Sequence, residues 1–560
     1  MQTGNDDRRV VGGDANAKKE ILLFFIIAGL LLSGCTTKTD QKVQQNTEDS
    51  GSTDTSAAEI DTSDMFSDRD KEVGYEEAES VEVQLADNGS FSQSDAVSVE
   101  NNTVKIKEKG TYILSGSLTD GMVIVEAEDT DKIQLVLDGV AISSSRSAAL
   151  YVRSADKVFV TSVSGTENSL ENAGPYDAID ENSIDAAVFS KSDLTFNGEG
   201  TLKISAQEGH GIVSKDDLIF TSGNYMVTSA AHGISGKDSV RIASGFYTIV
   251  SGKDGIHAEN ADDSSLGFVY AAGGTFSIKA EQDGISAGAW MQIEEGNYSI
   301  DSQDDGIHAD SNVSISGGTI NIEKSYEGIE GLSIDISGGE IFAVSSDDGI
   351  NAAGGNDSSG FEGPAGEDPF AVTEGAYIKI TGGTLHVNAS GDGLDSNGDI
   401  KITEGEIYVS GPVNDGNGTL DYSGNAEITG GIFAAAGSSG MAQNFNASSN
   451  QGCIMVNFDA QEAGTEIMLS DSSGNELLSW AADKRYSSVI ISCPEIRQGE
   501  TYTVKSGTAE QIVTMNSLIY GNNSPTGENS GYGRGKGSGE ENKMQNRPEM
   551  GQQRVYKENP

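Results

Sequence analysis

Acidic residues recur in this sequence directly before a glycine, in an acid-Gly-Ile or acid-Gly-Leu motif. The acids directly before the glycine are Asp254, Asp283, Asp305, Glu327, Asp348 and Asp392. A second acid precedes two of these, at Asp304 and Asp347. The residues that follow the motif include Glu330, Asn351, Asp395 and Asp421. Carboxylate and amide oxygens are the ligands that Ca²⁺ takes, six to eight of them at about 2.3–2.6 Å. The pattern therefore predicts calcium ligands at Asp283, Asp304, Asp305, Glu327, Glu330, Asp347, Asp348, Asn351, Asp392 and Asp395.

The motif belongs to an internal repeat of about 22 residues. Its apolar residue falls at Ile212, Ile234, Ile256, Ile285, Ile307, Ile329 and Ile350 and resumes at Leu394 and Leu420. A second column, of glycines, runs in step with it from Gly200 to Gly431. Extra residues at 260–266 and from 353 to about 375 break the period, and we expect them to form loops outside the stacked units.

Each repeat alternates apolar and polar residues around a glycine turn, as in residues 313–322. Period-two alternation predicts short strands, and glycine supplies the positive φ of sharp corners. A unit this small cannot bury its own apolar face, so the units must stack. The predicted fold is all-β, a parallel β-helix with about 22 residues per coil. A propeller blade would need about twice this length, and the signature of leucine-rich repeats is missing.

Stacking would place equivalent acids about 4.8 Å apart, where they repel by about 1 kcal/mol per pair in water and by more when half buried. A bound cation would compensate that repulsion. The alternative is a solvated acidic edge that discourages aggregation. The doubled acids at Asp304 and Asp347, which bracket Glu327 and Glu330, favour metal.

Other residue types give weaker patterns. His257 and His308 occupy one column two coils apart without an aligned cysteine or third histidine, so we expect them to be turn residues rather than zinc ligands. Trp480 is expected to pack inside a C-terminal cap or else to stack on a sugar ring. An alternating charge ladder is predicted for Lys191, Lys215 and Lys237 beside Asp193, Asp216 and Asp238.

The composition excludes one class of partner. The 560 residues carry 35 Lys and Arg against 87 Asp and Glu, a net charge of −52. Such a chain repels phosphate backbones, so nucleic-acid binding is not expected. Only three cysteines are present, too few for a disulfide scaffold.

The ends of the chain differ from its repetitive body. Lys18 and Lys19, the apolar run 21–32 and the segment 32–35 resemble a bacterial lipobox, which predicts a lipoprotein signal peptide over 1–34 and lipid on Cys35. The apolar run is too short to span a bilayer. We therefore expect a protein anchored by lipid to the extracellular face of the cell membrane. Cys453 and Cys493 remain, either as a disulfide pair or as two thiols.

The predicted organisation follows from these shifts in composition. Residues 35–80 are expected to be a disordered Ser/Thr/Asp-rich linker, 81–435 the β-helix, 436–515 a small C-terminal β-rich cap, and 516–560 a disordered tail. A cap is needed because the end of a solenoid exposes apolar surface and unpaired strand groups.

Several motifs resemble the carbohydrate-binding domain-containing proteins of bacterial surfaces, over about residues 81–507. They are residues 110–116, 135–140, 214–218, the Asp-Asp-Gly-Ile repeats, 391–398 and 437–441. The resemblance implies a right-handed parallel β-helix carrying calcium, similar in architecture to polysaccharide lyase family nine, and cellulose or acidic pectic polysaccharide as ligand. The motifs that contain His210 and His232 lack the usual Asp before glycine, so calcium is not expected near those coils.

Three functions are consistent with these features. The favoured one is a calcium-dependent binder of cell-wall polysaccharide, with no catalytic residue and with sugar-contacting residues that the sequence does not identify. The second is a calcium-dependent pectate lyase, for which Lys324 is the only lysine close to the acids between Asp304 and Asp348. The third is a structural surface stalk that binds nothing.

Overall fold

A computed structural model describes residues 61–352 and 372–521 of the chain. The predicted signal peptide, Cys35, residues 35–60 of the predicted linker, most of the larger insertion and the tail from residue 522 lie outside these residues. Within the described part, no helix has both the length and the apolar character needed to cross a membrane.

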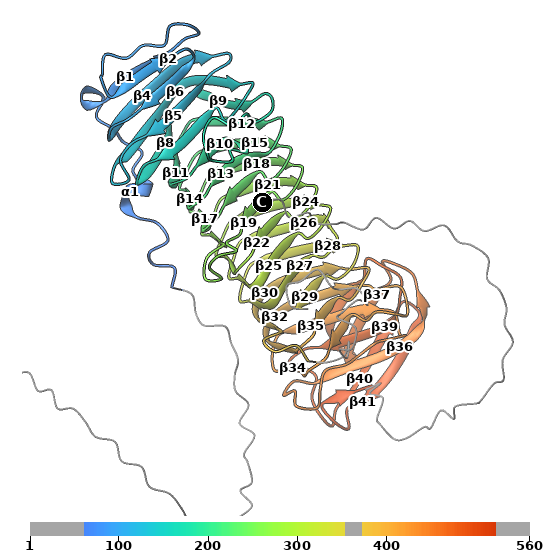
Figure 1. The fold of residues 1–560 in the computed structure, drawn as a ribbon. Helices are drawn as coiled ribbons and strands as arrows, with labels where there is room; N and C mark the ends of the chain where they lie inside the picture. Colours follow the sequence, from blue (N-terminus) through green and yellow to red (C-terminus); the bar gives the residue numbers. More distant parts are fainter. Residues whose placement is uncertain (1–60, 353–371, 522–560) are drawn as a thin grey trace, which may run out of the picture. The chain divides into compact units, whose positions relative to one another are not determined.

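The body is a parallel β-helix, in which every coil contributes one short strand to each of three faces. Its coils follow one another in sequence order from β4 to β35 (Figure 1). The Gly-Ile column predicted from the sequence is in register through the stack: Ile285 pairs with Ile307, Ile307 with Ile329, and Ile329 with Ile350. The predicted all-β solenoid is confirmed.

The first face carries the Gly-Ile column. Its strands are β7 (Leu150–Ser154), β10 (Ala186–Ser190), β13 (His210–Ser214), β16 (Ile234–Gly236), β19 (Ile256–Ala258), β22 (Ile285–Ala287), β25 (Ile307–Ile315), β27 (Ile329–Ile336), β29 (Ile350–Ala352), β31 (Leu394–Ser396) and β33 (Leu420–Tyr422).

The second face comes next in each coil. Its strands are β8 (Lys157–Ser162), β11 (Asp193–Gly198), β14 (Asp217–Phe220), β17 (Ser239–Ile242), β20 (Phe268–Ala271), β23 (Met291–Ile293), the later halves of β25 and β27, the first halves of β30 (Tyr377–Asn388) and β32 (Asp399–Ser410), and β34 (Ala426–Ile428).

The third face completes the coil. Its strands are β9 (Glu167–Asn172), β12 (Thr201–Ala206), β15 (Asn224–Ser229), β18 (Phe246–Ser251), β21 (Thr275–Ala280), β24 (Asn297–Ser302), β26 (Thr319–Ser325), β28 (Glu340–Ser345), the second halves of β30 and β32, and β35 (Ile432–Gly437).

Alternation along each strand explains the core. In β26, Ile320 and Ile322 are fully buried, Asn321 between them is partly exposed, and Glu323 and Lys324 are exposed. Glycine is required at two kinds of corner. Gly318 has φ +87°, a conformation that L side chains rarely adopt. At Gly306 a Cβ would overlap the side chain of Ile322 and the backbone of the next coil, so only glycine lets the coils approach this closely.

The first coils are built from longer strands. β1 (Val81–Leu85), β4 (Gly110–Leu118) and β6 (Lys132–Ser144) form one parallel ladder, and β3 (Thr103–Ile106) and β5 (Met122–Glu126) lead into β7. β2 (Val97–Glu100) pairs antiparallel with β3.

The predicted linker over 35–80 is wrong for its last part. Residues 61–80 contain α1 (Asp68–Lys71) and a 3₁₀ turn at Glu77–Glu79. Asp70 is buried against the second face, where its carboxylate contacts Lys157 Nζ at 2.8 Å and accepts a hydrogen bond from Thr195 Oγ1 at 2.7 Å. A polar composition suggested a solvated tether, but these buried contacts hold the segment on the solenoid.

Antiparallel strands follow the last coil. β35 pairs with β39 (Tyr486–Ser492), which pairs with β36 (Cys453–Gln461). A separate four-stranded sheet has the order β38 (Glu476–Ala481), β37 (Glu466–Asp471), β40 (Thr501–Ser506) and β41 (Ala509–Thr514).

Two predictions for the C-terminal part need correction. Cys453 and Cys493 are both buried free thiols, so the disulfide alternative is wrong. The tail predicted from residue 516 begins too early, because β42 (Ile519–Tyr520) pairs in parallel with Cys453 and Ile454 of β36.

Candidate functional site

The acids before glycine lie at the corner between the third and the first face, where each coil turns into the Gly-Ile strand. They are linked from coil to coil by hydrogen bonds to backbone. Asp254 Oδ1 accepts from the N–H of Asp283 at 3.2 Å, Asp283 Oδ1 from Asp305 at 3.1 Å, and Asp305 Oδ1 from Glu327 at 3.1 Å. These hydrogen bonds therefore fix Oδ1 of each aspartate and leave its Oδ2 free to contact other groups.

Most of the acids predicted as calcium ligands meet in three clusters, in each of which one ligand atom per residue lies within 4.8 Å of the others. The clusters are Asp283, Asp304 and Asp305; Asp305, His308 and Glu330; and Asp348, Asp392 and Asp395. Because Asp305 belongs to both of the first two clusters, these two clusters are continuous along successive coils. We call the residues of these clusters, with Glu327, Asp347 and Asn351, the acidic flank.

Two oxygens of the acidic flank are buried without a hydrogen-bond partner. Glu330, 1% exposed, has an unpartnered Oε1, and Asn351, fully buried, has an unpartnered Oδ1. The other end of the Asn351 amide donates to Glu327 Oε2 at 2.7 Å, which fixes the direction of its carbonyl oxygen. An unsatisfied buried acceptor costs about 1–3 kcal/mol, and a cation at this position would remove that cost.

Burial raises the pKa of most acids on the flank. The pKa rises to about 7 for Asp305 and Asp348, to about 8 for Asp283 and Asp392, and to about 9 for Glu327. For Asp283, Glu327 and Asp392, the negative charges of neighbouring acids add to the effect of burial. Asp395 is also raised well above its ordinary pKa, by burial and by three neighbouring carboxylates. For Asp305, burial outweighs the contact with His308, which lowers the pKa.

His308 is a member of the flank that the sequence did not identify. The prediction that His257 and His308 are turn residues is wrong, because they lie in strands β19 and β25. His308 Nδ1 lies 2.7 Å from Glu330 Oε2 and 3.2 Å from Asp305 Oδ2. Although burial lowers the pKa of His308, its contacts with these carboxylates and Asp310 raise it far above its ordinary value. The spacing Asp-Gly-Ile-His, which puts acid and imidazole three residues apart on one flank, was the available signal.

Asp347 stands apart from the three clusters, although it lies next to Asp348. A methyl group added to Gly391 would overlap the carboxylate oxygens of both Asp347 and Asp348. Because residue 391 is glycine, the backbone of the following coil can pack directly against these two carboxylates.

The predicted lysine ladder does not take the expected form. Lys237 pairs with Asp262 of the 260–266 insertion at 2.6 Å, and Lys215 Nζ lies 5.5 Å from the ring centroid of Phe189. Lys324 Nζ donates to Gln303 Oε1 at 2.7 Å, which holds it beside the coil that carries Asp304.

Aromatic residues form a stack on the third face near the cap. The rings of Phe342 and His386 are 4.9 Å apart and nearly parallel, those of His386 and Tyr408 are 5.1 Å apart, and Trp480 tilts against Tyr408 at 6.0 Å. Trp480 is partly buried against the core of the cap, as the packing alternative predicted. Because the rings cover one another, their faces do not form a flat platform for a sugar.

Comparison with known proteins identifies relatives of the central coils. Residues 100–349, a little under half of the chain, match the family model described as carbohydrate-binding domain-containing protein. This part of the chain is similar to carbohydrate-binding domain-containing proteins. The resemblance predicted from the motifs is thereby confirmed for these residues.

One curated relative and one solved structure give the extent of the similarity. A carbohydrate-binding domain-containing protein of Acetivibrio thermocellus is 37% identical over 135 residues, 24% of this chain, and the chain spans about half (47%) of that relative's length. A gadolinium derivative of a polysaccharide lyase-like protein from C. thermocellum is 31% identical, with a TM-score of 0.38, and the match covers 45% of this chain and 96% of that one.

Proposed function

We propose that this protein is a lipid-anchored, extracellular polysaccharide-binding protein that requires calcium and binds plant cell-wall glycans. The match of residues 100–349 to a carbohydrate-binding family model supports polysaccharide as the ligand class. The lipobox-like segment ending at Cys35 supports lipid anchoring outside the cell.

The observation that carries the calcium dependence is the pair of unpartnered buried oxygens on the acidic flank, Glu330 Oε1 and Asn351 Oδ1. They lie among carboxylates from adjacent coils, and carboxylate and amide oxygens are the ligands that Ca²⁺ selects. Calcium bound there by Glu327, Glu330, Asn351 and the neighbouring aspartates would replace repulsion between coils with attraction.

Charge distinguishes the two glycan candidates. A chain of net charge −52 repels polygalacturonate unless a cation bridges the two anions. Cellulose is neutral and needs open aromatic faces, whereas the rings of Phe342, His386 and Tyr408 cover one another. We therefore favour pectic polygalacturonate, held through calcium on the acidic flank.

A glycan array probed with the purified protein in calcium and then in chelator tests this function. We expect binding to acidic pectic glycans that chelator abolishes and calcium restores. Binding that is unchanged by chelator would refute the calcium requirement, and binding to no glycan would leave the structural stalk as the function.

The lyase alternative has one supporting observation, the placement of Lys324 beside Gln303 and the coil of Asp304. A lyase needs a base next to calcium that neutralises the uronate carboxylate. Incubation with polygalacturonate, followed by the ultraviolet absorbance of unsaturated products, separates the two functions. We expect no increase in absorbance; an increase that Lys324→Ala removes would establish the enzyme.

Cell fractionation tests the anchor. Because one cysteine would carry the lipid, we expect Cys35→Ala to move the protein from the membrane fraction to the medium. Retention of that variant in the membrane fraction would exclude lipid on Cys35.

A further inference from the structure

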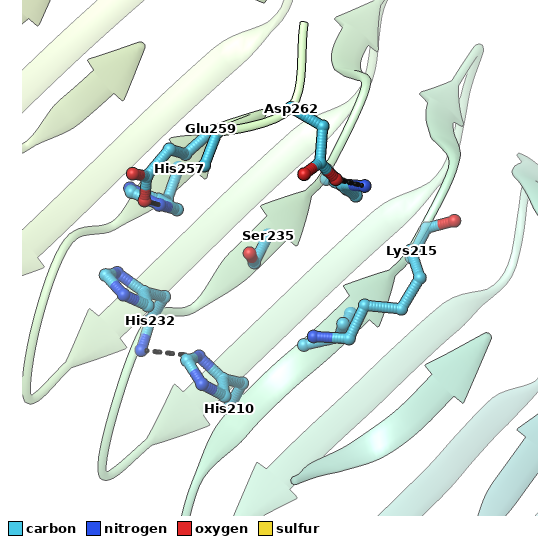
Figure 2. A pocket seen from close by; sticks show the side chains of 12 residues that line it. His210, Lys215, His232, Ser235, His257, Glu259 and Asp262 are labelled. Atoms are coloured by element: carbon cyan, nitrogen blue, oxygen red, sulfur yellow. Dashed lines mark hydrogen bonds and ion pairs between the residues drawn. The ribbon is translucent and has the colours of Figure 1, made fainter. Parts of the chain in front are cut away.

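Three histidines form a stack on successive coils at the N-terminal side of the acidic flank. The rings of His210 and His232 are 4.9 Å apart and those of His232 and His257 are 4.2 Å apart, all nearly parallel. Figure 2 shows the three rings along one side of a surface pocket of about 550 Å³, with Lys215 on the other side. The motifs that contain His210 and His232 lack the acid before glycine, whereas the motif before His257 has Asp254.

Two of the imidazoles converge on one buried carboxylate. His232 Nδ1 lies 3.0 Å and His257 Nδ1 lies 2.8 Å from Asp254 Oδ2, and the Asp254 side chain is 7% exposed. Neither nitrogen has a hydrogen-bond partner, although both are buried, because neither contact has hydrogen-bond geometry. Three potential ligand atoms therefore lie within 4.8 Å of one another.

His257 lies between two carboxylates, with Nδ1 facing Asp254 Oδ2 at 2.8 Å. Its Nε2 lies 3.5 Å from Glu259 Oε2, so the ring can keep a proton on Nε2 when a metal replaces the proton at Nδ1. This carboxylate–imidazole pair is the usual support of a metal-ligating histidine.

His210 has a different role. Its Nδ1 already accepts a hydrogen bond from the backbone N–H of His232 at 3.2 Å, so that nitrogen is not available to a metal. Figure 2 shows this bond joining the two residues. The ring of His210 instead packs on that of His232 and limits how it can turn.

We propose that His232 Nδ1, Asp254 Oδ2 and His257 Nδ1 bind a transition-metal dication of the Zn²⁺ type. Tetrahedral zinc with ligands at about 2.0–2.2 Å separates its donors by about 3.3–3.5 Å, so shifts of about half an ångström would admit the ion. Two imidazole nitrogens and one carboxylate suit zinc, whereas the acidic flank, whose groups are mainly carboxylates, suits calcium. His232 and His257 both line the pocket, so the fourth position is open to water or to a ligand there.

The site is independent of the proposed calcium function, and Co²⁺ serves as its spectroscopic probe. The full-length protein is titrated with Co²⁺ in excess Ca²⁺, which fills the carboxylate sites, and Zn²⁺ is then added as competitor. We expect the visible bands of tetrahedral, nitrogen-ligated Co²⁺, and their loss when Zn²⁺ replaces the ion.

Three variants each remove one proposed ligand: His232→Ala, His257→Ala and Asp254→Asn. The last keeps Oδ1 as the acceptor for the N–H of Asp283, so it preserves the backbone ladder. We expect each to weaken Zn²⁺ binding by more than about 100-fold, and Glu259→Gln by about tenfold.

His386→Ala is the matched control, since His386 also lies in a ring stack, between Phe342 and Tyr408, and should bind no metal. The proposal is overturned if the parent binds neither Co²⁺ nor Zn²⁺, if Ca²⁺ displaces them, or if the ligand variants bind like His386→Ala. Any of these results would leave Asp254 and His257 as an ion pair without metal. Far-ultraviolet circular dichroism establishes that each variant is folded.

Discussion

The carboxylate of Asp305 joins two coils, because its Oδ1 accepts a hydrogen bond from the N–H of Glu327, 22 residues later, at 3.1 Å. Its other oxygen, Oδ2, faces His308 Nδ1 at 3.2 Å. Asp348 is fixed in the same way by the N–H of Asp392, at 2.5 Å. The backbone of each coil thus orients acids of the coil before it, so these proposed calcium ligands are held in place by the protein itself.

Calcium-free protein should lose stability as the pH rises. The pKa values of Asp305, Asp348 and Glu327 are raised to about 7, 7 and 9, so between pH 4 and these values the folded state binds protons that the unfolded chain has lost. Each such group lowers the free energy of unfolding by about 1.4 kcal/mol per pH unit in that window. We expect the melting temperature in calcium-depleted buffer to fall from about pH 5 to about pH 8.

Calcium should flatten this dependence, because the ion takes the place of the protons. At 100 times its Kd, an ion that binds only the folded state adds about 2.7 kcal/mol. Scanning calorimetry with and without calcium across this pH range measures both effects. Parallel pH profiles in the two buffers would argue against calcium on the flank.

Removing charge at the last cluster should lower the calcium stoichiometry. In Asp347→Asn with Asp348→Asn, the amide oxygen of the second residue can still accept the N–H of Asp392, so the coil connection survives while two charges are lost. We expect at least one ion fewer per chain by calorimetric titration, and polygalacturonate binding weaker by about tenfold, or 1.4 kcal/mol.

The control for this variant must remove two acids outside the acidic flank. Asp216 and Asp217 are unsuitable, because Asp217 forms an ion pair with Arg241 that is largely buried. Glu404 and Glu406 of β32 are exposed acids on the same solenoid, so Glu404→Gln with Glu406→Gln matches the charge change. Equal calcium binding by the two double variants would mean that Asp347 and Asp348 bind no calcium and that the acidic flank is a solvated edge.

The coil architecture could be predicted because it is periodic. Ile307 stacks on Ile285 and under Ile329 as the 22-residue spacing required, and the acids before glycine fall on one flank for the same reason. A residue at a fixed place in the repeat lies beside its equivalent in the next coil, so the spacing alone predicts where most of the acidic flank lies.

Contacts that depend on a side-chain rotamer or on a partner outside the repeat could not be predicted in this way. His308 reaches the flank through the rotamer of one side chain, and Asp70 packs against Lys157 and Thr195 from a segment of linker-like composition. That Glu330 Oε1 and Asn351 Oδ1 have no hydrogen-bond partner depends on the positions of all neighbouring side chains, which the spacing does not give. The period predicts where a residue lies in the coil but not which atoms its side chain contacts.

Truncating the apolar column should destabilise the solenoid. Ile307 is fully buried between Ile285 and Ile329, so Ile307→Ala leaves a cavity that the coils above and below can fill only in part. We expect a loss of about 2–5 kcal/mol in the free energy of unfolding, measured by denaturant titration. Val250→Ala on β18, where the side chain is 44% exposed, is the control and should change stability by less than about 0.5 kcal/mol. A similar effect of both substitutions would mean that the column is not the core.

The N-terminal segment should detach when its buried charge is removed. Asp70 is 2% exposed, contacts Lys157 Nζ at 2.8 Å and accepts from Thr195 Oγ1 at 2.7 Å, and the Lys157 side chain is 12% exposed. Asp70→Ala leaves this lysine buried with its main partner gone, a loss that costs about 3–5 kcal/mol when a buried pair is broken. Because residues 61–80 can leave the solenoid without unfolding it, we expect local release: rapid proteolysis within 61–80 and little change in the main melting transition. Asp70→Ala with Lys157→Met removes both charges and should restore much of the protection. Proteolysis of Asp70→Ala at the parent rate would show that other contacts hold the segment.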